Sequence, residues 1–322
     1  MKIVYFAPSG FDYSSNQMTE GLHLLSKYGK IKFMCTQKFV HHGSKIEDLT
    51  LVDESEAYDS ARSDADIILI SSGGDLDFYS GYRKMILDDP LMKHKIVFLD
   101  GHDSNQYLID PDRVALYLKR ELRYPEANSL AWSNVRSLLF GVYDFHFDYK
   151  RPGFFDRDID ISFVAFGGSN KIRFECAEAI RHGVDIGKFK NCRVEVESDK
   201  QPVSIDAYHA IMLRSKVIVS VPGAGYDTLR FWEAMGFGSV LASIDVSRVM
   251  VVRNAPEPNR HAILFDSWSS MLELVHNVVN DHATWQRIRN SADYLVKCNH
   301  STTHRAVQMI QMFKEISCQE IS

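Results

Sequence analysis

Apolar residues in this chain fall into short continuous runs, separated by polar segments in which hydrophobic residues recur at helical spacing. In the first hundred residues the runs lie at residues 2–7, 30–35, 65–71 and 95–100. Between the first two runs, Met18, Leu22 and Leu25 follow the period of an amphipathic helix. Continuous apolar strands flanked by helices are typical of a parallel sheet covered on both faces. The first half is therefore predicted to be a doubly wound α/β domain.

The same alternation starts again at residue 159, after a stretch in which the pattern loosens. That stretch contains Arg151-Pro-Gly, and Pro-Gly among charged residues is typical of a linker between domains. Predicted strands follow at 159–166, 192–196 and 216–220, and predicted helices at 173–181, 205–214, 269–280, 283–298 and 302–316. The expected fold is α/β, with two Rossmann-like domains at residues 1–150 and 151–300 and a helical C-terminal tail at 301–322.

Length and composition agree with two folded domains. A chain of 322 residues is long for one hydrophobic core, and its apolar fraction of 45% is ordinary for a globular protein. The net charge of −5 provides no overall attraction to nucleic acid or to an anionic membrane. The five cysteines are scattered, which favours reduced thiols and a cytoplasmic location. No run approaches the roughly 20 apolar residues that span a bilayer, so integral membrane association is not expected.

The most informative segment runs from Ser215 to Ser243. It combines a buried strand, a glycine turn, a helix carrying Arg230 and Glu233, a glycine stop and a second buried strand. This order places the amides of a helix start beside a strand end, where nucleotide phosphates bind in α/β folds. Glu233 lies about one and a half turns into the helix, a distance suited to a ribose in the same pocket. The segment predicts a nucleotide-sugar site, although Arg230 and Glu233 alone are also consistent with a surface ion pair.

Within this segment, the turn itself supplies further candidates. Gly223 and Gly225 allow the backbone to approach a ligand closely, and Tyr226 follows them. Asp227 or Thr228 is expected to cap the helix through its side chain.

A second glycine turn precedes the helix predicted at 173–181. Gly168 again permits close approach of the backbone, and Lys171 and Arg173 offer charge-assisted contacts to a diphosphate. The alternative is a plain turn between strand and helix with solvated basic residues.

Ionisable side chains gather after the strand predicted at 95–100. Asp100, His102 and Asp103 lie within four residues of one another. Open α/β sheets bind ligands at the carboxyl ends of their strands, and Asp or His suits a general base. The alternative is an Asx turn that only shapes the loop. The nearby residues 117–121 are expected to form either a cationic edge of this site or an ordinary helical surface.

Other catalytic motifs are absent from the sequence. The adjacent His41 and His42 have no companion Cys or spaced carboxylates, so no metal site is expected. The chain also has no nucleophile elbow, Walker loop or Ser-x-x-Lys motif.

Taken together, these residues resemble glycosyltransferases of the GT-B type, which have two Rossmann-like domains. The likeness is to exostosin-like and spore-maturation-protein-like groups with a family-one-like C-terminal domain. It rests on Ser215–Ser220, on Gly225–Ala234 with Gly238, and on the helix start at His300–Ala306. It covers roughly Ile159–Phe313, and the first half of the chain in outline.

The resemblance implies a nucleotide-diphosphate sugar as co-substrate, with Glu233 on its ribose and residues 225–228 near its phosphates. It also implies an acceptor bound by the first domain, a final helix that crosses back to that domain, and no permanently bound cofactor or metal. The sequence lacks the second, upstream Glu of the commoner retaining pattern, which leaves the stereochemistry open.

The predicted function is transfer of a hexosyl or pentosyl group from the nucleotide sugar to a hydroxyl acceptor. Asp100 or Asp103 is expected to take the acceptor proton, with His102 as the next choice. The acceptor is a glycan or, as in phage genomes, a hydroxylated base of DNA. Two alternatives are a non-catalytic nucleotide-sugar-binding protein and a nucleotide-sugar epimerase.

Overall fold

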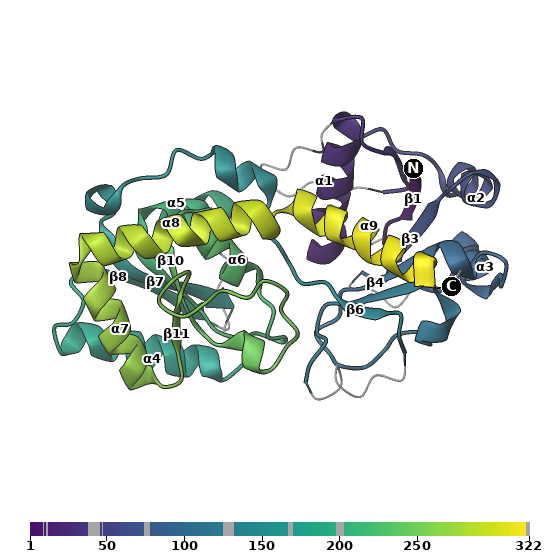
Figure 1. Ribbon diagram of the computed structural model, residues 1–322. Coiled ribbons are helices and arrows are strands. Elements are labelled where there is room, and N and C mark those ends of the chain that lie inside the picture. The colour runs from purple at the N-terminus through teal and green to yellow at the C-terminus, as the bar shows by residue number, and fades with distance from the viewer. Residues whose placement is uncertain are drawn as a thin grey trace. The chain divides into compact units, whose positions relative to one another are not determined.

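The chain folds into two compact units (Figure 1). A computed structural model describes residues 1–8, 10, 12–37, 46, 48–73, 78–124, 132–166, 170–197 and 203–319. Unit 1 comprises Met1–Phe145 and Ser301–Ser322, and unit 2 comprises His146–His300. Each unit contains its own parallel sheet and its own hydrophobic core.

The sheet of unit 1 has the strand order β2-β1-β3-β4-β5-β6, and every neighbouring pair is parallel. Its strands are β1 Lys2–Phe6, β2 Lys32–Cys35, β3 Ile67–Ser71, β4 Ile96–Asp100, β5 Leu116–Lys119 and β6 Val135–Ser137. All five residues of β3 and of β4 are buried, which explains the continuous apolar runs in the sequence. Because the strands are parallel, the loops after β1 and β4 leave the same edge of the sheet.

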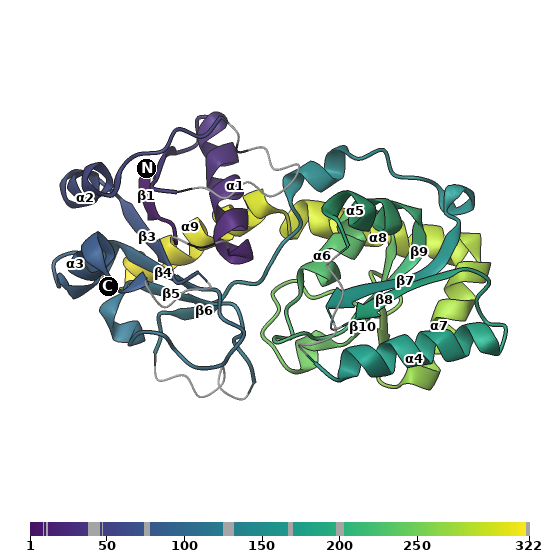
Figure 2. The same ribbon diagram turned by 180° about the vertical axis from the view of Figure 1, so that it is seen from behind.

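Helices cover the unit 1 sheet, and the C-terminal helix is one of them. They are α1 Tyr13–Lys27, α2 Glu54–Ser63, α3 Gly81–Asp88 and α9 Thr302–Gln319, with short 3₁₀ helices η2 Lys93–Lys95 and η3 Pro111–Arg113. A further 3₁₀ helix, η5 Asp144–Asp148, begins in unit 1 and ends in unit 2. α9 lies against α1, as the views from opposite sides show (Figures 1 and 2). Met309 and Phe313 of α9 share a core with Leu22 of α1. A side chain at Gly21 would meet the carbonyl oxygen of Thr302 at 2.2 Å, so the helices approach closely there.

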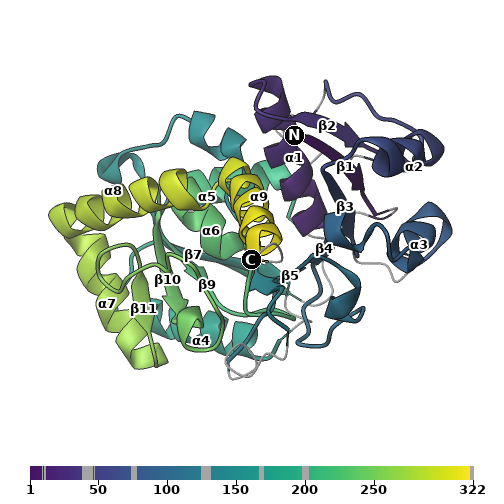
Figure 3. The same ribbon diagram turned by 45° about the vertical axis from the view of Figure 1, so that its right-hand side comes forward.

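The sheet of unit 2 has the strand order β11-β10-β9-β7-β8, again parallel throughout (Figure 3). Its strands are β7 Ile159–Phe166, β8 Cys192–Glu197, β9 Ser215–Ser220, β10 Val240–Ile244 and β11 Ile263–Phe265. Its helices are α4 Ile172–Asp185, α5 Ile205–Arg214, α6 Leu229–Gly236, α7 Trp268–Asn280 and α8 His282–Asn299, with 3₁₀ helices η6 Phe154–Asp156 and η8 Val246–Arg248. α4 and α7 pack together, while α5, α6 and α8 contact the central strands β7, β9 and β10.

The predicted fold class is confirmed, since both units are parallel sheets with flanking helices and the chain ends in a helix. The sequence analysis did not predict α2, β5, β6 or the short 3₁₀ helices. The alternative that residues 117–121 form a helical surface is wrong, because Tyr117 and Leu118 are fully buried in β5. Lys119, the last residue of β5, is buried as well, and its polar character hid this strand from the hydrophobic pattern.

Candidate functional site

The turn between β9 and α6 positions the charged side chains of the first candidate site. β9 ends at Ser220, and the amide of Gly223 then donates to the carbonyl of Gly225 at 2.9 Å. After α6, Gly238 adopts a φ of 68°, which favours glycine and stops the helix. The succession of strand, turn, helix and glycine stop is the one expected from the sequence.

Arg230 lies in the first turn of α6, and part of its guanidinium group is buried. Its Nε and Nη1 atoms have no hydrogen-bond partner among the described residues. The guanidinium carbon lies 5.6 Å from the centre of the Phe163 ring. Leaving a buried charged donor unpaired costs more free energy than leaving a neutral one unpaired. These donors therefore suit an anionic ligand.

Glu233 lies one turn further along α6 and is 4% exposed. Its Oε2 atom accepts a hydrogen bond of 2.7 Å from the hydroxyl group of Tyr208. Burial raises the pKa of Glu233, while the Tyr208 hydrogen bond and the charge of Arg230 oppose that rise. The alternative of an exposed surface ion pair is wrong, because the carboxyl group is buried and Tyr208 is its hydrogen-bonded neighbour.

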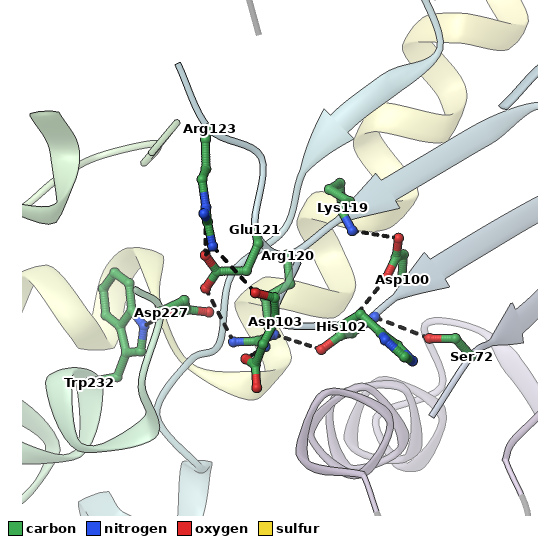
Figure 4. Close-up of polar contacts among 11 residues, drawn as sticks. Ser72, Asp100, His102, Asp103, Lys119, Arg120, Glu121, Arg123, Asp227 and Trp232 are labelled. Carbon is green, nitrogen blue, oxygen red and sulfur yellow. Dashed lines mark hydrogen bonds and ion pairs between the residues drawn. The ribbon is translucent and has the colours of Figure 1, made fainter. Parts of the chain in front are cut away.

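The expected side-chain cap of α6 is not formed. Thr228 occupies the N-cap position, but its side chain makes no cap hydrogen bond and its hydroxyl lies 2.8 Å from that of Ser220. Asp227 is buried and accepts a hydrogen bond of 2.8 Å from the indole of Trp232 (Figure 4). Tyr226 is half-buried in the same turn. Both predicted caps bond elsewhere, so neither Asp227 nor Thr228 is seen to cap the start of α6 with its side chain.

The start of α4 lies beside this turn. The side-chain amide of Asn170 donates to the carbonyl of Gly223 at 3.0 Å, and Nε of Arg173 donates to the carbonyl of Pro222 at 3.2 Å. Two turns predicted separately from the sequence are thereby joined in unit 2. Gly168, the glycine of the first of them, lies outside the described residues.

The three basic residues predicted to bind the donor have different surroundings. The Lys171 side chain is 88% exposed and its ammonium pairs with Glu175 at 3.2 Å. Arg173 is 9% exposed and is held by the backbone after β9. Arg230 alone of these three has buried N–H groups that lack a partner in the described part of the chain.

In unit 1, Asp100 ends β4 and is fully buried. Its Oδ2 atom accepts a hydrogen bond of 2.6 Å from the hydroxyl of Tyr117. The same oxygen accepts a hydrogen bond of 2.7 Å from the ammonium of Lys119 (Figure 4). Burial lowers the pKa of Lys119, and the charge of Asp100 opposes that shift. The Oδ1 atom of Asp100 accepts a hydrogen bond of 3.0 Å from the amide of His102, so an Asx turn does shape this loop. With both oxygens engaged, Asp100 is suited to holding the loop in place.

Asp103 differs from Asp100 in being accessible. Its side chain is 49% exposed and pairs with the buried guanidinium of Arg120 (Figure 4). Arg120 also donates to the carbonyl of Gly101 at 2.9 Å and lies 4.4 Å above the ring centre of Phe140. The pairing orients the carboxylate and leaves it in contact with solvent.

Asp12 and Ser14, which the sequence analysis missed, lie next to Gly101 in the loop after β4. Asp12 caps α1, since its Oδ2 atom accepts hydrogen bonds of 2.7 Å from both the amide and the hydroxyl of Ser15. A side chain on Gly101 would lie 3.1 Å from the hydroxyl of Ser14 and 3.3 Å from Oδ1 of Asp12. Burial raises the pKa of Asp12 despite these hydrogen bonds. An Asp followed three residues later by a Ser, just after the first strand, was the signal available in the sequence.

Buried polar atoms without partners also occur here. Nε2 of His102 and the hydroxyl of Ser14 have no hydrogen-bond partner among the described residues. His102 lies in the loop after β4, and Ser14 lies in the first turn of α1, which follows β1. Both are at the carboxyl edge of the unit 1 sheet, where open α/β sheets bind ligands. Asp103 is the exposed member of the cluster expected from the sequence, and His102 is half-buried.

Two other kinds of site have no candidates in the part of the chain that the structure describes. No group of three or more His, Cys, Asp or Glu side chains there is arranged to hold a metal ion. None of the helices described is both long and apolar enough to cross a membrane.

Comparison with known proteins gives one family and a set of similar folds. Residues 171–311 match the model of a family described as glycosyl transferase-like. The match covers unit 2 from Lys171 onward and the first part of α9. None of the curated proteins matches the chain in sequence.

Solved structures are similar over nearly the whole chain. An alpha-glucosyltransferase in complex with UDP is 14% identical over 98% of this chain and 100% of its own, with a TM-score of 0.62. An alpha-glucosyltransferase in complex with UDP and a 13-mer DNA containing an HMU base is 13% identical, with coverage of 98% and 99% and a TM-score of 0.62. Sucrose-phosphate synthase from Thermosynechococcus elongatus is 12% identical, with coverage of 99% and 100% and a TM-score of 0.57. At these identities the likeness establishes the fold.

Proposed function

Since the chain is a glycosyltransferase of the GT-B fold with a family-one-like C-terminal domain, we propose that it transfers a sugar from a uridine diphosphate sugar to a hydroxyl group. In this proposal unit 2 binds the donor and unit 1 binds the acceptor. UDP is chosen because similar structures were solved with it.

The guanidinium group of Arg230 is the observation that carries the donor half of this proposal. Its buried Nε and Nη1 atoms lack partners among the described residues, and they stand at an α6 start without a side-chain cap. A diphosphate would satisfy these donors and the amides of the first turn together. Glu233, oriented by Tyr208, would then accept hydrogen bonds from the ribose hydroxyls.

In the reaction, the acceptor oxygen bonds to the anomeric carbon of the sugar as the bond from that carbon to the diphosphate breaks. The departing UDP takes the bonding electrons, and Arg230 with the α6 amides stabilises its charge. Contacts of this kind are worth about 3 kcal/mol of barrier each, or on the order of a hundredfold in rate.

The acceptor must also lose a proton. We assign it to Asp103, which is half exposed and oriented by Arg120. His102 is the second candidate, because its Nε2 atom has no partner in the described part of the chain. Asp100 would position both residues through the loop that it holds.

The donor assignment is tested by measuring UDP binding to Arg230→Gln in a calorimeter. Losing hydrogen bonds to a charged partner should weaken UDP binding on the order of 10–100-fold. Arg248→Gln is the matched control, since Arg248 is also in unit 2 but is 73% exposed and pairs with Asp245. Equal UDP affinity in wild type and R230Q would refute the donor site.

Product analysis then separates the catalytic alternatives. A transferase should release UDP from a UDP-sugar faster when a hydroxyl acceptor is added. An epimerase would instead convert the sugar without an acceptor, and a binding protein would bind UDP without turnover.

A further inference from the structure

Four basic side chains gather at the edge of the unit 2 sheet where the strands begin. They are Arg151, Arg157, Arg289 and Lys297, hereafter the arginine cluster. Arg157 precedes β7, and Gly238, which contacts the cluster, precedes β10. The candidate donor residues follow the opposite, carboxyl ends of β7 and β9. A strand of six residues is about 20 Å long, so the two sets of residues are separate.

Arg157 forms the buried floor of the cluster. It is 2% exposed, and its guanidinium donates to the carbonyls of Ser215 at 2.6 Å, Phe237 at 3.0 Å and Gly238 at 3.0 Å. Burial and the charges of Arg289 and Arg151 lower the pKa of Arg157 to about 9. The carbonyl groups that accept its hydrogen bonds are neutral, so they leave its charge uncompensated.

Arg151 and Arg289 lie over Gly238. A side chain on Gly238 would meet Cδ of Arg151 at 2.9 Å and Nε of Arg289 at 3.2 Å. The Arg151 side chain is 7% exposed, yet its Nε and Nη2 atoms have no hydrogen-bond partner among the described residues. Nε of Arg289 is also buried without a partner there, while the residue as a whole is half-buried.

One carboxylate, Asp293, pairs with members of the cluster. It contacts Nη1 of Arg151 and lies 2.8 Å from the ammonium of Lys297. Within the described contacts, Asp293 thus pairs with Arg151 and Lys297, and its charge also acts on Arg289, while Arg157 has only neutral partners. Bringing like charges together in a partly desolvated place is unfavourable, so an additional anion would lower the energy.

We propose that the arginine cluster is a second anion site, which binds a small phosphate-bearing ion. The Nε and Nη2 atoms of Arg151 and Nε of Arg289 would donate to the phosphate oxygens. Guanidinium groups match phosphate geometry, and the divalent charge suits the excess of cations better than a carboxylate would. The ion is inorganic phosphate or the phosphoryl group of a metabolite, and these two sources share the same recognition chemistry.

Thermal unfolding of the full-length protein with increasing inorganic phosphate tests this inference, with ionic strength held constant by NaCl. Binding to the folded state should raise the melting temperature of the wild type by about 2 °C or more at saturation. Arg289→Gln should weaken phosphate binding at least about tenfold. Arg287→Gln, on the same helix but exposed, should leave phosphate binding unchanged. Glucose 6-phosphate in place of phosphate identifies which source binds more tightly.

Two further variants separate this site from its own carboxylate and from the candidate donor site. Asp293→Asn removes the competing carboxylate. The D293N protein should therefore bind phosphate more tightly than the wild type, even if its melting temperature without phosphate is lower. Arg230→Gln should keep the phosphate response, because Arg230 belongs to the candidate donor site. The inference is overturned if the wild type shows no response, if R289Q responds like the wild type, or if R230Q loses the response.

Discussion

At the scale of single residues, hydrogen bonding separates buried charged groups that hold the fold from those that we propose to bind a ligand. Asp100 is buried and fully engaged by Tyr117 and Lys119. Arg230 is partly buried with donors that have no partner among the described residues. A buried group whose hydrogen bonds are complete stabilises the native structure, whereas an incomplete one costs free energy until a ligand completes it.

Glu233 gives a prediction about pH. Because burial raises the pKa of Glu233 above its ordinary 4.5, the folded protein binds this proton more tightly than the unfolded chain does. The stability contributed by the protonated group is complete below about pH 4.5 and is lost as the pH rises through the folded pKa. The melting temperature of Glu233→Gln should therefore rise relative to wild type between pH 5 and pH 8.

Glu273→Gln is the control for that series. Lys188 lowers the pKa of Glu273, and the Glu273 side chain is 60% exposed, so the contribution of this group to stability changes only below about pH 4.5. The melting-temperature difference between E273Q and wild type should therefore stay constant between pH 5 and pH 8. A difference between E233Q and wild type that stays constant across the pH range would contradict the buried, proton-binding role of Glu233.

Asp103 gives a prediction about turnover. If it takes the acceptor proton, Asp103→Asn should lower kcat on the order of 10²–10⁴-fold, the usual contribution of a general base. UDP affinity measured by calorimetry should stay within about twofold of wild type, because the donor contacts lie in unit 2. Unchanged kcat in D103N, with kcat lost in His102→Asn, would move the role to His102.

At the scale of elements, the contact between α1 and α9 makes the end of the chain part of unit 1. The hydroxyl oxygen of Thr302 lies 2.7 Å from Oε2 of buried Glu20 and 2.5 Å from Oδ2 of Asp144, and its single proton is donated to one of them at a time. The amide of Thr302 bonds to the carbonyl of Val142 at 2.9 Å. Ser301 caps α9, because its Oγ accepts a hydrogen bond of 3.2 Å from the amide of His304.

Gly21→Ala tests this close helix contact. The added methyl group would meet the Thr302 carbonyl at 2.2 Å, so the helices must separate. Overpacking of this kind should lower the free energy of unfolding by about 1–3 kcal/mol, measured by urea denaturation. Ser26→Ala, on a less buried part of α1, should change it by no more than about 0.5 kcal/mol. Equal urea midpoints for G21A and S26A would show that α9 moves away from α1 without loss of stability, which would contradict the expected overpacking.

At the scale of the whole molecule, the GT-B likeness predicted from the sequence is confirmed by the family match and the similar folds. The net charge helps to choose between the two acceptors considered in the sequence analysis, a glycan and a hydroxylated base of DNA. A chain with a net charge of −5 is poorly suited to a long DNA contact, so we expect a glycan acceptor.

Salt dependence distinguishes the two acceptor classes. With a glycan acceptor, transfer should change less than about threefold between 50 and 200 mM NaCl. A protein that makes 6–10 phosphate contacts loses on the order of 10³–10⁵ in DNA affinity over that range. A steep fall in transfer to DNA containing hydroxymethylated bases, with no transfer to glycans, would reverse this expectation.

The sequence by itself determined the fold class, most strands and helices, and the strand-turn-helix segment that carries Arg230 and Glu233. These features are local, because hydrophobic periodicity and glycine positions act within a few residues. The sequence analysis missed β5 because this strand has only four residues and its polar residue Lys119 is buried through Asp100, which lies 19 residues away.

Only the tertiary structure decided which charged side chains have partners for all their hydrogen-bonding groups and which do not. Lys171 and Arg230 are equivalent basic residues in the sequence, yet one is exposed beside Glu175 and the other holds buried donors. The arginine cluster joins Arg151 to Arg289 across more than a hundred residues, so no local pattern reveals it. Side-chain partners come from long-range packing, and that packing sets burial, charge balance and therefore chemistry.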